Sequence, residues 1–167
     1  MGRVPDFPKP GILFYDVTTL FLEAEALREV IDRLADYARS REVDYVISAE
    51  ARGFVLGGAV AAAAGAGFVL ARKPGKLPRA TTSVQYQLEY GVDALEVHAD
   101  AVRDGARVLV HDDLLATGGT ATALCELVEQ AGGVVAGCAF VIELAFLNGR
   151  ERLGDRDVRS LVVYEDA

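Results

Sequence analysis

The stretch V-L-V-H-D-D-L-L-A-T-G-G-T, Val108–Thr120, decides the fold of this 167-residue chain. An apolar run leads directly into two adjacent carboxylates, and a loop of small residues then opens a predicted helix. Glycines allow positive φ angles, so the backbone N–H groups of such a loop can converge beside the partial positive charge of a helix N-terminus. In parallel α/β sheets, ligands bind at the carboxyl ends of the strands. The stretch therefore predicts a buried strand, an anion-binding loop and a helix in succession.

The rest of the chain alternates strands and helices in the same way. Apolar periodicity and runs predict helices at 23–40, 54–64 and 119–131, and strands at 45–48, 68–71, 107–111, 134–144 and 158–164. The segment 72–84 is interpreted as a loop, and 81–91 as a polar, β-prone excursion that ends in a turn. This order predicts an α/β fold with a central, mostly parallel sheet flanked by helices. The length fits one domain, residues 1–167.

Composition excludes several classes of protein. The chain has 25 acidic and 17 basic residues, a net charge of −8, and 51% hydrophobic residues. The acidic balance argues against a nucleic-acid or anionic-membrane partner, and the apolar content argues against disorder. Gly53–Ala71 is uncharged over a membrane-spanning length, but its Ala and Gly content favours a small-residue helix followed by a strand.

The N-terminal segment and the two cysteines indicate a cytoplasmic protein. Met1–Pro10 has no apolar run of the kind that a signal peptide needs. Cys125 and Cys138 lie in a predicted buried helix and a predicted buried strand, so both are interpreted as small buried thiols of a reducing compartment. With two histidines in the chain, a zinc site has too few ligands.

The acidic pair and the loop after it suit a phosphorylated sugar. Asp112 and Asp113 would repel a bare phosphate, but they can accept hydrogen bonds from a vicinal diol or hold the waters of a divalent cation. The loop Ala116-Thr117-Gly118-Gly119-Thr120 offers backbone N–H groups and two hydroxyls to a phosphate monoester, and it lacks the Gly-Lys-Ser/Thr of a Walker A loop. A ribose 5-phosphate fits both features. An acidic helix cap followed by a glycine turn is the alternative.

Val108–Thr120 resembles the 5-phosphoribosyl-1-pyrophosphate (PRPP) motif of type I phosphoribosyltransferases. Further blocks resemble adenine phosphoribosyltransferases in the same order: Pro5–Phe14, Glu50–Phe54, Arg72–Pro78, Leu88–Gly91 and Leu114–Thr120. Several ordered blocks, spread over about Val4 to Leu153, are more specific than any one of them. The resemblance implies the type I phosphoribosyltransferase fold, with an N-terminal hood segment at about 1–20 and a flexible catalytic loop at about 73–92.

The resemblance implies transfer of the 5-phosphoribosyl group from PRPP to N9 of adenine, which yields AMP and pyrophosphate in purine salvage. It also implies Mg²⁺, held mainly by PRPP and water rather than by direct protein ligands, and a homodimer in the cytoplasm. No nucleic acid or membrane is expected as a partner. Two alternatives stay open: transfer to another purine base, and a non-catalytic PRPP- or nucleotide-sensing regulator on the same fold.

The same resemblance implies roles for residues of the PRPP site. Glu89, in the flexible catalytic loop that closes over the substrates, is the implied catalytic residue that handles the adenine proton, although by itself it looks like an exposed loop acid. Asp112 and Asp113 bind the ribose hydroxyls, and Ala116 to Thr120 bind the 5-phosphate of PRPP or AMP. The implied pyrophosphate ligands are Arg52, Arg72, Lys73 and Lys76, in the same or the neighbouring subunit, with a non-proline cis peptide bond between Glu50 and Ala51.

The implied adenine site comes from the two ends of the chain. Phe14, which its spacing alone favours as a core residue, is expected to stack on the base, and Leu147 to close the other face. Main-chain groups of Leu13 and Tyr15 are expected to read the base edge. Tyr15 departs from the family, which usually has a basic residue there, and His111 is interpreted as a hydrogen-bonded core histidine.

The distribution of charge agrees with this site. Residues 50–90 hold five basic and two acidic side chains, a local net charge of +3, so the remainder of the chain carries −11. A concentrated cluster of cations in an acidic protein suits a small polyanion such as PRPP.

Overall fold

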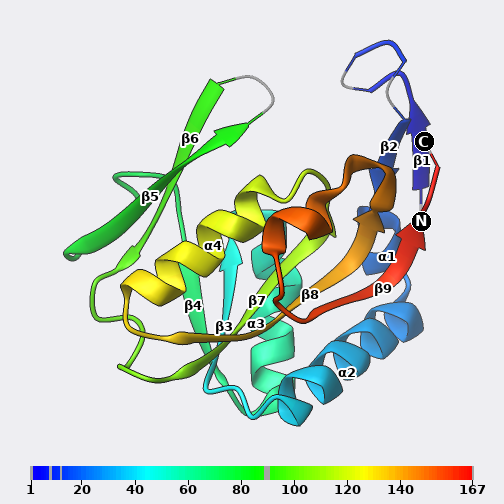
Figure 1. Cartoon of the computed structure of the whole chain (residues 1–167). Helices are drawn as coiled ribbons and strands as arrows, with labels where there is room; N and C mark the ends of the chain where they lie inside the picture. The colour runs from blue at the N-terminus through cyan, green and yellow to red at the C-terminus, as the bar shows by residue number, and fades with distance from the viewer. Residues whose placement is uncertain (1, 8, 12, 89–90, 167) are drawn as a thin grey trace.

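The computed structural model describes residues 2–7, 9–11, 13–88 and 91–166, and its centre is a five-stranded parallel sheet (Figure 1). The strand order is β4-β3-β7-β8-β9. The strands are β3 (Tyr45–Ala49), β4 (Gly67–Ala71), β7 (Arg107–Leu115), β8 (Val134–Leu144) and β9 (Val158–Tyr164). The predicted α/β fold is confirmed, because apolar runs buried on both faces form parallel strands between covering helices.

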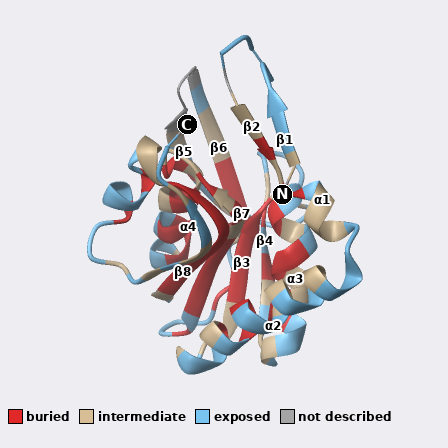
Figure 2. Cartoon of the chain, turned by 90° about the vertical axis from the view of Figure 1, so that its right-hand side faces the viewer, coloured by how far each residue is buried: buried red, intermediate tan, exposed pale blue. Residues whose placement is uncertain are grey.

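Helices cover both faces of the sheet. They are α1 (Thr18–Phe21), α2 (Ala24–Ser40), α3 (Arg52–Ala64) and α4 (Gly119–Gln130), with short 3₁₀ helices η1 (Ala145–Leu147) and η2 (Gly149–Leu153). Figure 2 shows α4 on one side of the buried strands and α2 with α3 on the other, and each side has its own apolar core. Helix α3 begins shortly after the carboxyl end of β3 and helix α4 shortly after that of β7, so the starts of both helices lie at this edge of the sheet.

The Ala- and Gly-rich segment is a helix on the sheet, as expected. Helix α3 buries Gly53, Leu56, Gly57, Val60 and Ala61, and β4 follows it. Within the described ranges, no helix has both the length and the apolar character needed to cross a membrane.

Two antiparallel hairpins extend beyond the carboxyl ends of the sheet (Figure 1). One pairs β1 (Gly2–Pro5) with β2 (Leu13–Asp16), and the other, called the hood hairpin here, pairs β5 (Thr81–Leu88) with β6 (Gly91–His98). The β-prone character of 81–91 is confirmed over 81–88, whereas the expected turn at 89–90 lies outside the described residues. The loop prediction for 72–84 is wrong over 81–84, which belong to β5. Strands β1, β2 and β6 were not predicted from the sequence.

Strand β7 is longer than predicted and includes the acidic pair. Its pairing with β8 continues to Leu115, opposite Glu143, so Asp112 and Asp113 belong to the last part of the strand rather than to the loop after it. Strand pairing therefore fixes the backbone that carries these carboxylates.

The buried thiols and His111 lie in the core. Cys125 and Cys138 are fully buried with their Sγ atoms 3.8 Å apart. The fully buried His111 shares a hydrogen bond of 2.9 Å between Nδ1 and the Ala139 carbonyl oxygen. Burial lowers the pKa of His111 to about 4, so the ring is neutral near pH 7. The prediction of a hydrogen-bonded core histidine is confirmed, although Nε2 lacks a partner among the described residues.

Candidate active site

The loop after β7 forms one wall of a cavity of about 180 Å³. Its lining comprises Arg52, Asp112, Asp113, Leu114, Leu115, Ala116, Thr117, Gly118, Gly119, Thr120 and Ala121. Gly118 caps α4 with a φ of +82°, which L side chains rarely adopt, and a Cβ there would lie 2.5 Å from the Gly149 carbonyl oxygen. The structure thus brings the acidic pair and the whole predicted phosphate loop onto one cavity at the start of a helix.

The acidic pair sits at the bottom of this cavity in a partly desolvated place. Asp113 is buried and its Oδ2 lies 3.0 Å from Nε of Arg52, while Asp112 Oδ1 accepts a hydrogen bond of 3.0 Å from the Asp113 N–H. Burial, followed by the charge of Asp113, raises the pKa of Asp112 well above its ordinary value of 3.8. A protonated Asp112 could donate a hydrogen bond to a diol, and the oxygens of both side chains could accept hydrogen bonds from it.

The Asp112→Asn variant is expected to be more stable than the wild type. The folded protein keeps a proton on Asp112 that the unfolded chain releases above about pH 4, so this group's destabilising effect grows as the pH rises toward the folded pKa. Asn removes that effect, and we expect a melting temperature about 2–4 °C higher at pH 8. Thermal unfolding at pH 5 and pH 8 tests this, since the gain should be larger at pH 8. An equal or lower melting temperature at pH 8 contradicts it.

Arg52 connects the acidic pair to the N-terminal hairpin. Helix α3 begins at Arg52, directly after the Glu50–Ala51 peptide bond, which is cis as the resemblance implied. The half-exposed guanidinium carbon lies 5.7 Å from the centroid of the Phe14 ring, close enough for a cation–π contact. Arg52 is thus placed between the expected ribose and adenine positions.

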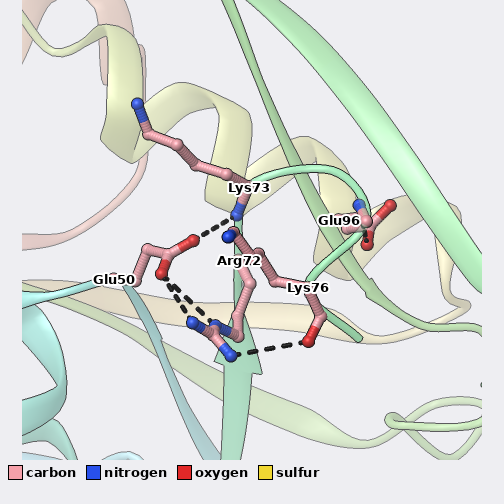
Figure 3. A network of polar contacts seen from close by, with 6 residues as sticks. Glu50, Arg72, Lys73, Lys76 and Glu96 are labelled. Atoms are coloured by element: carbon pink, nitrogen blue, oxygen red, sulfur yellow. Dashed lines mark hydrogen bonds and ion pairs between the residues drawn. The ribbon is translucent and has the colours of Figure 1, made fainter. Parts of the chain in front are cut away.

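The basic residues after β4 form an ordered network around Glu50 (Figure 3). Arg72 donates to Glu50 Oε2 at 2.9 Å and to the Lys76 carbonyl oxygen at 3.4 Å, while the Lys73 N–H donates to Glu50 Oε1 at 2.6 Å. These bonds lower the pKa of Glu50, with the Lys73 N–H as the largest cause. The Lys73 side chain extends away from Glu50 in Figure 3, and its Nζ lies 3.2 Å from Asp93 Oδ2.

A second cavity of about 300 Å³ adjoins the first and shares its acidic pair. Its lining comprises Ala49, Glu50, Ala51, Arg52, Gly53, Lys73, Tyr86, Asp93, Leu95, Asp112, Asp113 and Thr120. Of the four expected pyrophosphate ligands, the structure thus brings Arg52 and Lys73 together here. Arg72 and Lys76 are absent from the linings of both cavities within the described ranges.

Two residues of the hood hairpin were missed by the sequence interpretation. Tyr86 on β5 and Asp93 on β6 are cross-strand partners in register, and both line the second cavity. Burial is the main cause that raises the pKa of Tyr86, so its hydroxyl stays protonated. The available signal was the alternation of Val84 and Tyr86 along β5, which places both on the inner face of the strand.

The expected adenine ligands come from β2 and η1. Phe14 is half-buried and meets Phe7 edge to face at 5.1 Å between centroids. The Tyr15 side chain is buried, stacked on Tyr164 at 4.2 Å, with the Arg3 guanidinium carbon 5.9 Å from its ring centroid. A buried Tyr15 ring leaves its main chain as the part that can face a ligand.

Leu13 and Leu147 are both partly buried against the same core. Glu89, the expected catalytic residue, lies outside the described residues. Among the residues that are described, no group of three or more His, Cys, Asp or Glu side chains is arranged to hold a metal ion.

Comparison with known proteins agrees with this geometry. Residues 18–163 match the model of the phosphoribosyl transferase domain family. An adenine phosphoribosyltransferase from Rubrobacter xylanophilus is 61% identical over 98% of this chain and 89% of its own length. The crystal structure of an adenine phosphoribosyltransferase from Thermoanaerobacter pseudethanolicus has a TM-score of 0.94 at 48% identity, covering 98% of this chain and 95% of that one.

A third similar protein carries ligands. The adenine phosphoribosyltransferase from Saccharomyces cerevisiae, complexed with D-2,5-dideoxy-2,5-imino-altritol 1,6-bisphosphate and adenine, has a TM-score of 0.91 at 38% identity. The match covers 96% of this chain and 93% of the yeast chain.

Two observations define the class of this protein. The parallel sheet carries an acidic pair and a glycine loop at its carboxyl end, and the family model matches most of the chain. The chain belongs to the phosphoribosyltransferase family, and it is an enzyme of that class. Its similarity to relatives over nearly their whole length places it more narrowly, among the adenine phosphoribosyltransferases.

Proposed function

We propose that this chain transfers the 5-phosphoribosyl group of PRPP to N9 of adenine and releases AMP and pyrophosphate, a reaction of purine salvage. The observation that carries the proposal is the cavity in which the Asp112–Asp113 pair, Arg52 and the loop 116–120 meet. Diol acceptors, a cation and a phosphate loop are the three recognition elements that PRPP needs. The near full-length similarity to adenine phosphoribosyltransferases supports the choice of base.

In this proposal the loop 116–120 holds the 5-phosphate while Asp112 and Asp113 bind the ribose hydroxyls. The bond between C1 of ribose and pyrophosphate breaks, and a bond between N9 of adenine and C1 forms. In the transition state both bonds are weak, and positive charge develops on the sugar. Arg52 and Lys73 stabilise the departing pyrophosphate by charge-assisted hydrogen bonds. Both cations now pair with carboxylates, Asp113 and Asp93, so PRPP would replace these partners.

Arg72 and Lys76 have a less direct place in the proposed reaction. Glu50 and the Lys76 carbonyl oxygen hold the Arg72 guanidinium in the present arrangement. A contact of Arg72 or Lys76 with pyrophosphate therefore requires either movement of the segment 72–78 or a position in the neighbouring subunit of a homodimer.

The residues present fit the Mg²⁺ that the family implies. The Asp112–Asp113 pair lies on the shared wall of both cavities, where carboxylate oxygens can accept hydrogen bonds from the waters of a hydrated cation. Mg²⁺ bound with PRPP would neutralise charge on the leaving pyrophosphate.

Adenine is proposed to bind between the β1–β2 hairpin and η1. Phe14 stacks on one face of the base and Leu147 covers the other, while main-chain groups of Leu13 and Tyr15 bind its edge. Glu89, which lies between β5 and β6 in the sequence, is proposed to manage the proton of adenine as N9 attacks. Closure of the hood hairpin would exclude the water that could hydrolyse the activated sugar.

A PRPP-dependent assay with four bases tests the proposed function. With Mg²⁺, adenine is expected to give AMP at least about 100-fold faster than guanine, hypoxanthine or xanthine, because edge hydrogen bonds discriminate strongly between purines. Formation of AMP and of pyrophosphate should be equimolar. Faster reaction with another base favours the purine alternative, and tight PRPP binding without turnover favours the sensing regulator.

We also propose that the protein is a homodimer of the cytoplasm. Val55 of α3 and Leu70 of the edge strand β4 are large apolar side chains that are 54% and 43% exposed. Exposed apolar side chains on a helix and on a sheet edge suit a contact with a second copy of the chain. Sedimentation analysis of the purified chain tests the dimer, and a monomer at micromolar concentration would contradict it.

A further inference from the structure

We infer that the Glu143–Arg150 ion pair positions the adenine and phosphate parts of the site relative to each other. The inference rests on the proposed function, because it takes Leu147 and the loop 116–120 as substrate-binding elements. The segment 145–153, which contains η1 and η2, follows β8 and carries both Leu147 and Arg150. It is called the capping segment below.

The capping segment rests on the phosphate loop by direct backbone contact. Gly149 is buried, and a Cβ there would lie 2.1 Å from the Ala116 carbonyl oxygen and 2.9 Å from the Gly118 backbone nitrogen. A Cβ on Gly118 would in turn meet the Gly149 carbonyl oxygen. Because no side chain separates the two backbones, a shift of the capping segment must displace the loop or open a gap beside it.

Arg150 is the group that ties this segment to the sheet. Its Nε donates to Glu143 Oε1 at 2.8 Å and its Nη2 to Glu143 Oε2 at 2.5 Å, while Nη1 donates to the Val158 carbonyl oxygen at 3.0 Å. Ser160 donates a further hydrogen bond of 2.6 Å to Glu143 Oε2. One guanidinium thus fixes the residue next to Gly149 against β8 and β9 at once.

Glu143 is well placed to transmit this restraint. It is 4% exposed on β8 and lies in register with Leu115, the last residue of β7 before the phosphate loop. The Arg150 hydrogen bonds lower the pKa of Glu143, so the pair stays charged at every assay pH near neutral. A bidentate pair restrains both distance and orientation, and removal of one partner leaves the other charge without compensation.

Arg150→Ala is expected to lower kcat/KM for adenine and for PRPP together, each by about 10- to 100-fold, because small displacements of substrate-binding groups cost this much. Neither Arg150 nor Glu143 lines the two substrate cavities. A loss of kcat/KM for both substrates would therefore come from displaced substrate-binding groups rather than from a lost contact between Arg150 and a substrate. Arg150→Lys keeps the positive charge but cannot donate two parallel hydrogen bonds to the Glu143 carboxylate. We expect this variant to recover part of the kcat/KM that Arg150→Ala loses.

Arg156→Ala is the matched control. Arg156 also forms an ion pair, with Glu129 at 2.6 Å, and also donates to a backbone carbonyl, that of Leu153 at 3.2 Å. It follows the capping segment and ties it to α4, away from Gly149. We expect wild-type kcat/KM values for Arg156→Ala and a smaller drop in its melting temperature than in that of Arg150→Ala, because the Glu129 side chain is 49% exposed. Equal kinetic losses in the two variants would indicate general destabilisation and overturn the inference.

Hydrogen–deuterium exchange without substrates tests the inference independently of activity. Arg150→Ala should accelerate exchange at the amides of residues 116–120, and Arg156→Ala should leave them unchanged. Unchanged exchange at 116–120 in Arg150→Ala, or unchanged kcat/KM for both substrates in that variant beside an active wild type, would overturn the inference. An inactive wild type would instead refute the proposed function, and the exchange result would still decide the positioning role.

Discussion

Replacement of both Asp112 and Asp113 by Asn is expected to abolish measurable PRPP binding. Asn keeps one acceptor oxygen at each position but puts an amide NH2 group where the second carboxyl oxygen meets the ribose diol, so an acceptor becomes a donor. Hydrogen bonds to charged groups contribute about 1.5–3 kcal/mol each, so the two changes together should weaken PRPP binding by about a thousandfold. The two carboxylates lie on the wall that both cavities share, where no other described acidic side chain belongs to both linings. Calorimetric titration of PRPP with Mg²⁺ into the double variant measures the effect.

The double variant needs a control for folding and for bulk charge. Asp100→Asn removes a carboxylate that pairs with Arg79 at 2.9 Å and lines neither cavity, so it should bind PRPP as the wild type does. Asn has nearly the shape of Asp, and the Asp112→Asn single variant should melt above the wild type at pH 8. Unchanged PRPP affinity in the double variant would remove the ribose role from the acidic pair.

The sequence predicted the central sheet well because the signal there is local. Val108–Val110 and Val134–Leu144 are apolar runs that are long enough to be buried on both faces, and glycines separate them from their helices. The phosphate loop was predictable for the same reason: strand, glycine turn and helix N-terminus are adjacent in the chain. Chain order alone then placed the acidic pair at the carboxyl end of the sheet.

The hairpins were harder to predict because their stability comes from pairing. Strand β1 is half polar and mostly exposed, and it is defined by its register with β2. Strand β6 alternates Leu95 and Val97 inward, but Asp93 and Glu96 make its hydrophobic pattern weak. Short strands of this kind have little intrinsic preference, so cross-strand contacts decide them.

The partners of the cations could not be read from the sequence either. Lys73 pairs with Asp93 across twenty residues, and Arg52 pairs with Asp113 across more than sixty. Spacing along the chain carries no information on such pairs, whereas the fold brings them together at the strand ends. The same holds for Gly149, whose importance appears only when its backbone is seen against Ala116.

These pairs neutralise the cations of the site within the protein itself. Each of Arg52, Arg72 and Lys73 contacts a carboxylate, so the cations are held in place before an anion arrives. PRPP would offer several charges in exchange for each single carboxylate, which favours the exchange while the fold avoids unpaired cations in a cavity. The Arg52 guanidinium also lies over the Phe14 ring, which is proposed to stack on adenine. A movement of Arg52 toward pyrophosphate would therefore also change the surroundings of the adenine base.

Glu89→Ala is expected to lower kcat by about 10²- to 10⁴-fold, the usual contribution of a general acid or base. The KM for PRPP should change by less than about threefold, because the groups proposed to bind PRPP are the acidic pair, Arg52, Lys73 and the loop 116–120, and Glu89 is not among them. Strands β5 and β6 flank Glu89 in sequence and bring Tyr86 and Asp93 to the second cavity. Steady-state kinetics with each substrate varied in turn measures both parameters.

Glu89→Gln separates proton transfer from shape. The amide keeps the size and hydrogen-bonding reach of the carboxylate but cannot exchange a proton near neutral pH, so it should lose nearly as much kcat as Ala does. If Gln instead retained wild-type turnover, Glu89 would act by closing the hood rather than by moving a proton. If Glu89→Ala also retained wild-type turnover, the proton of adenine would have to pass to another group at the second cavity. Asp93 of the hood hairpin lines that cavity, and its carboxylate lies 3.2 Å from Lys73 Nζ.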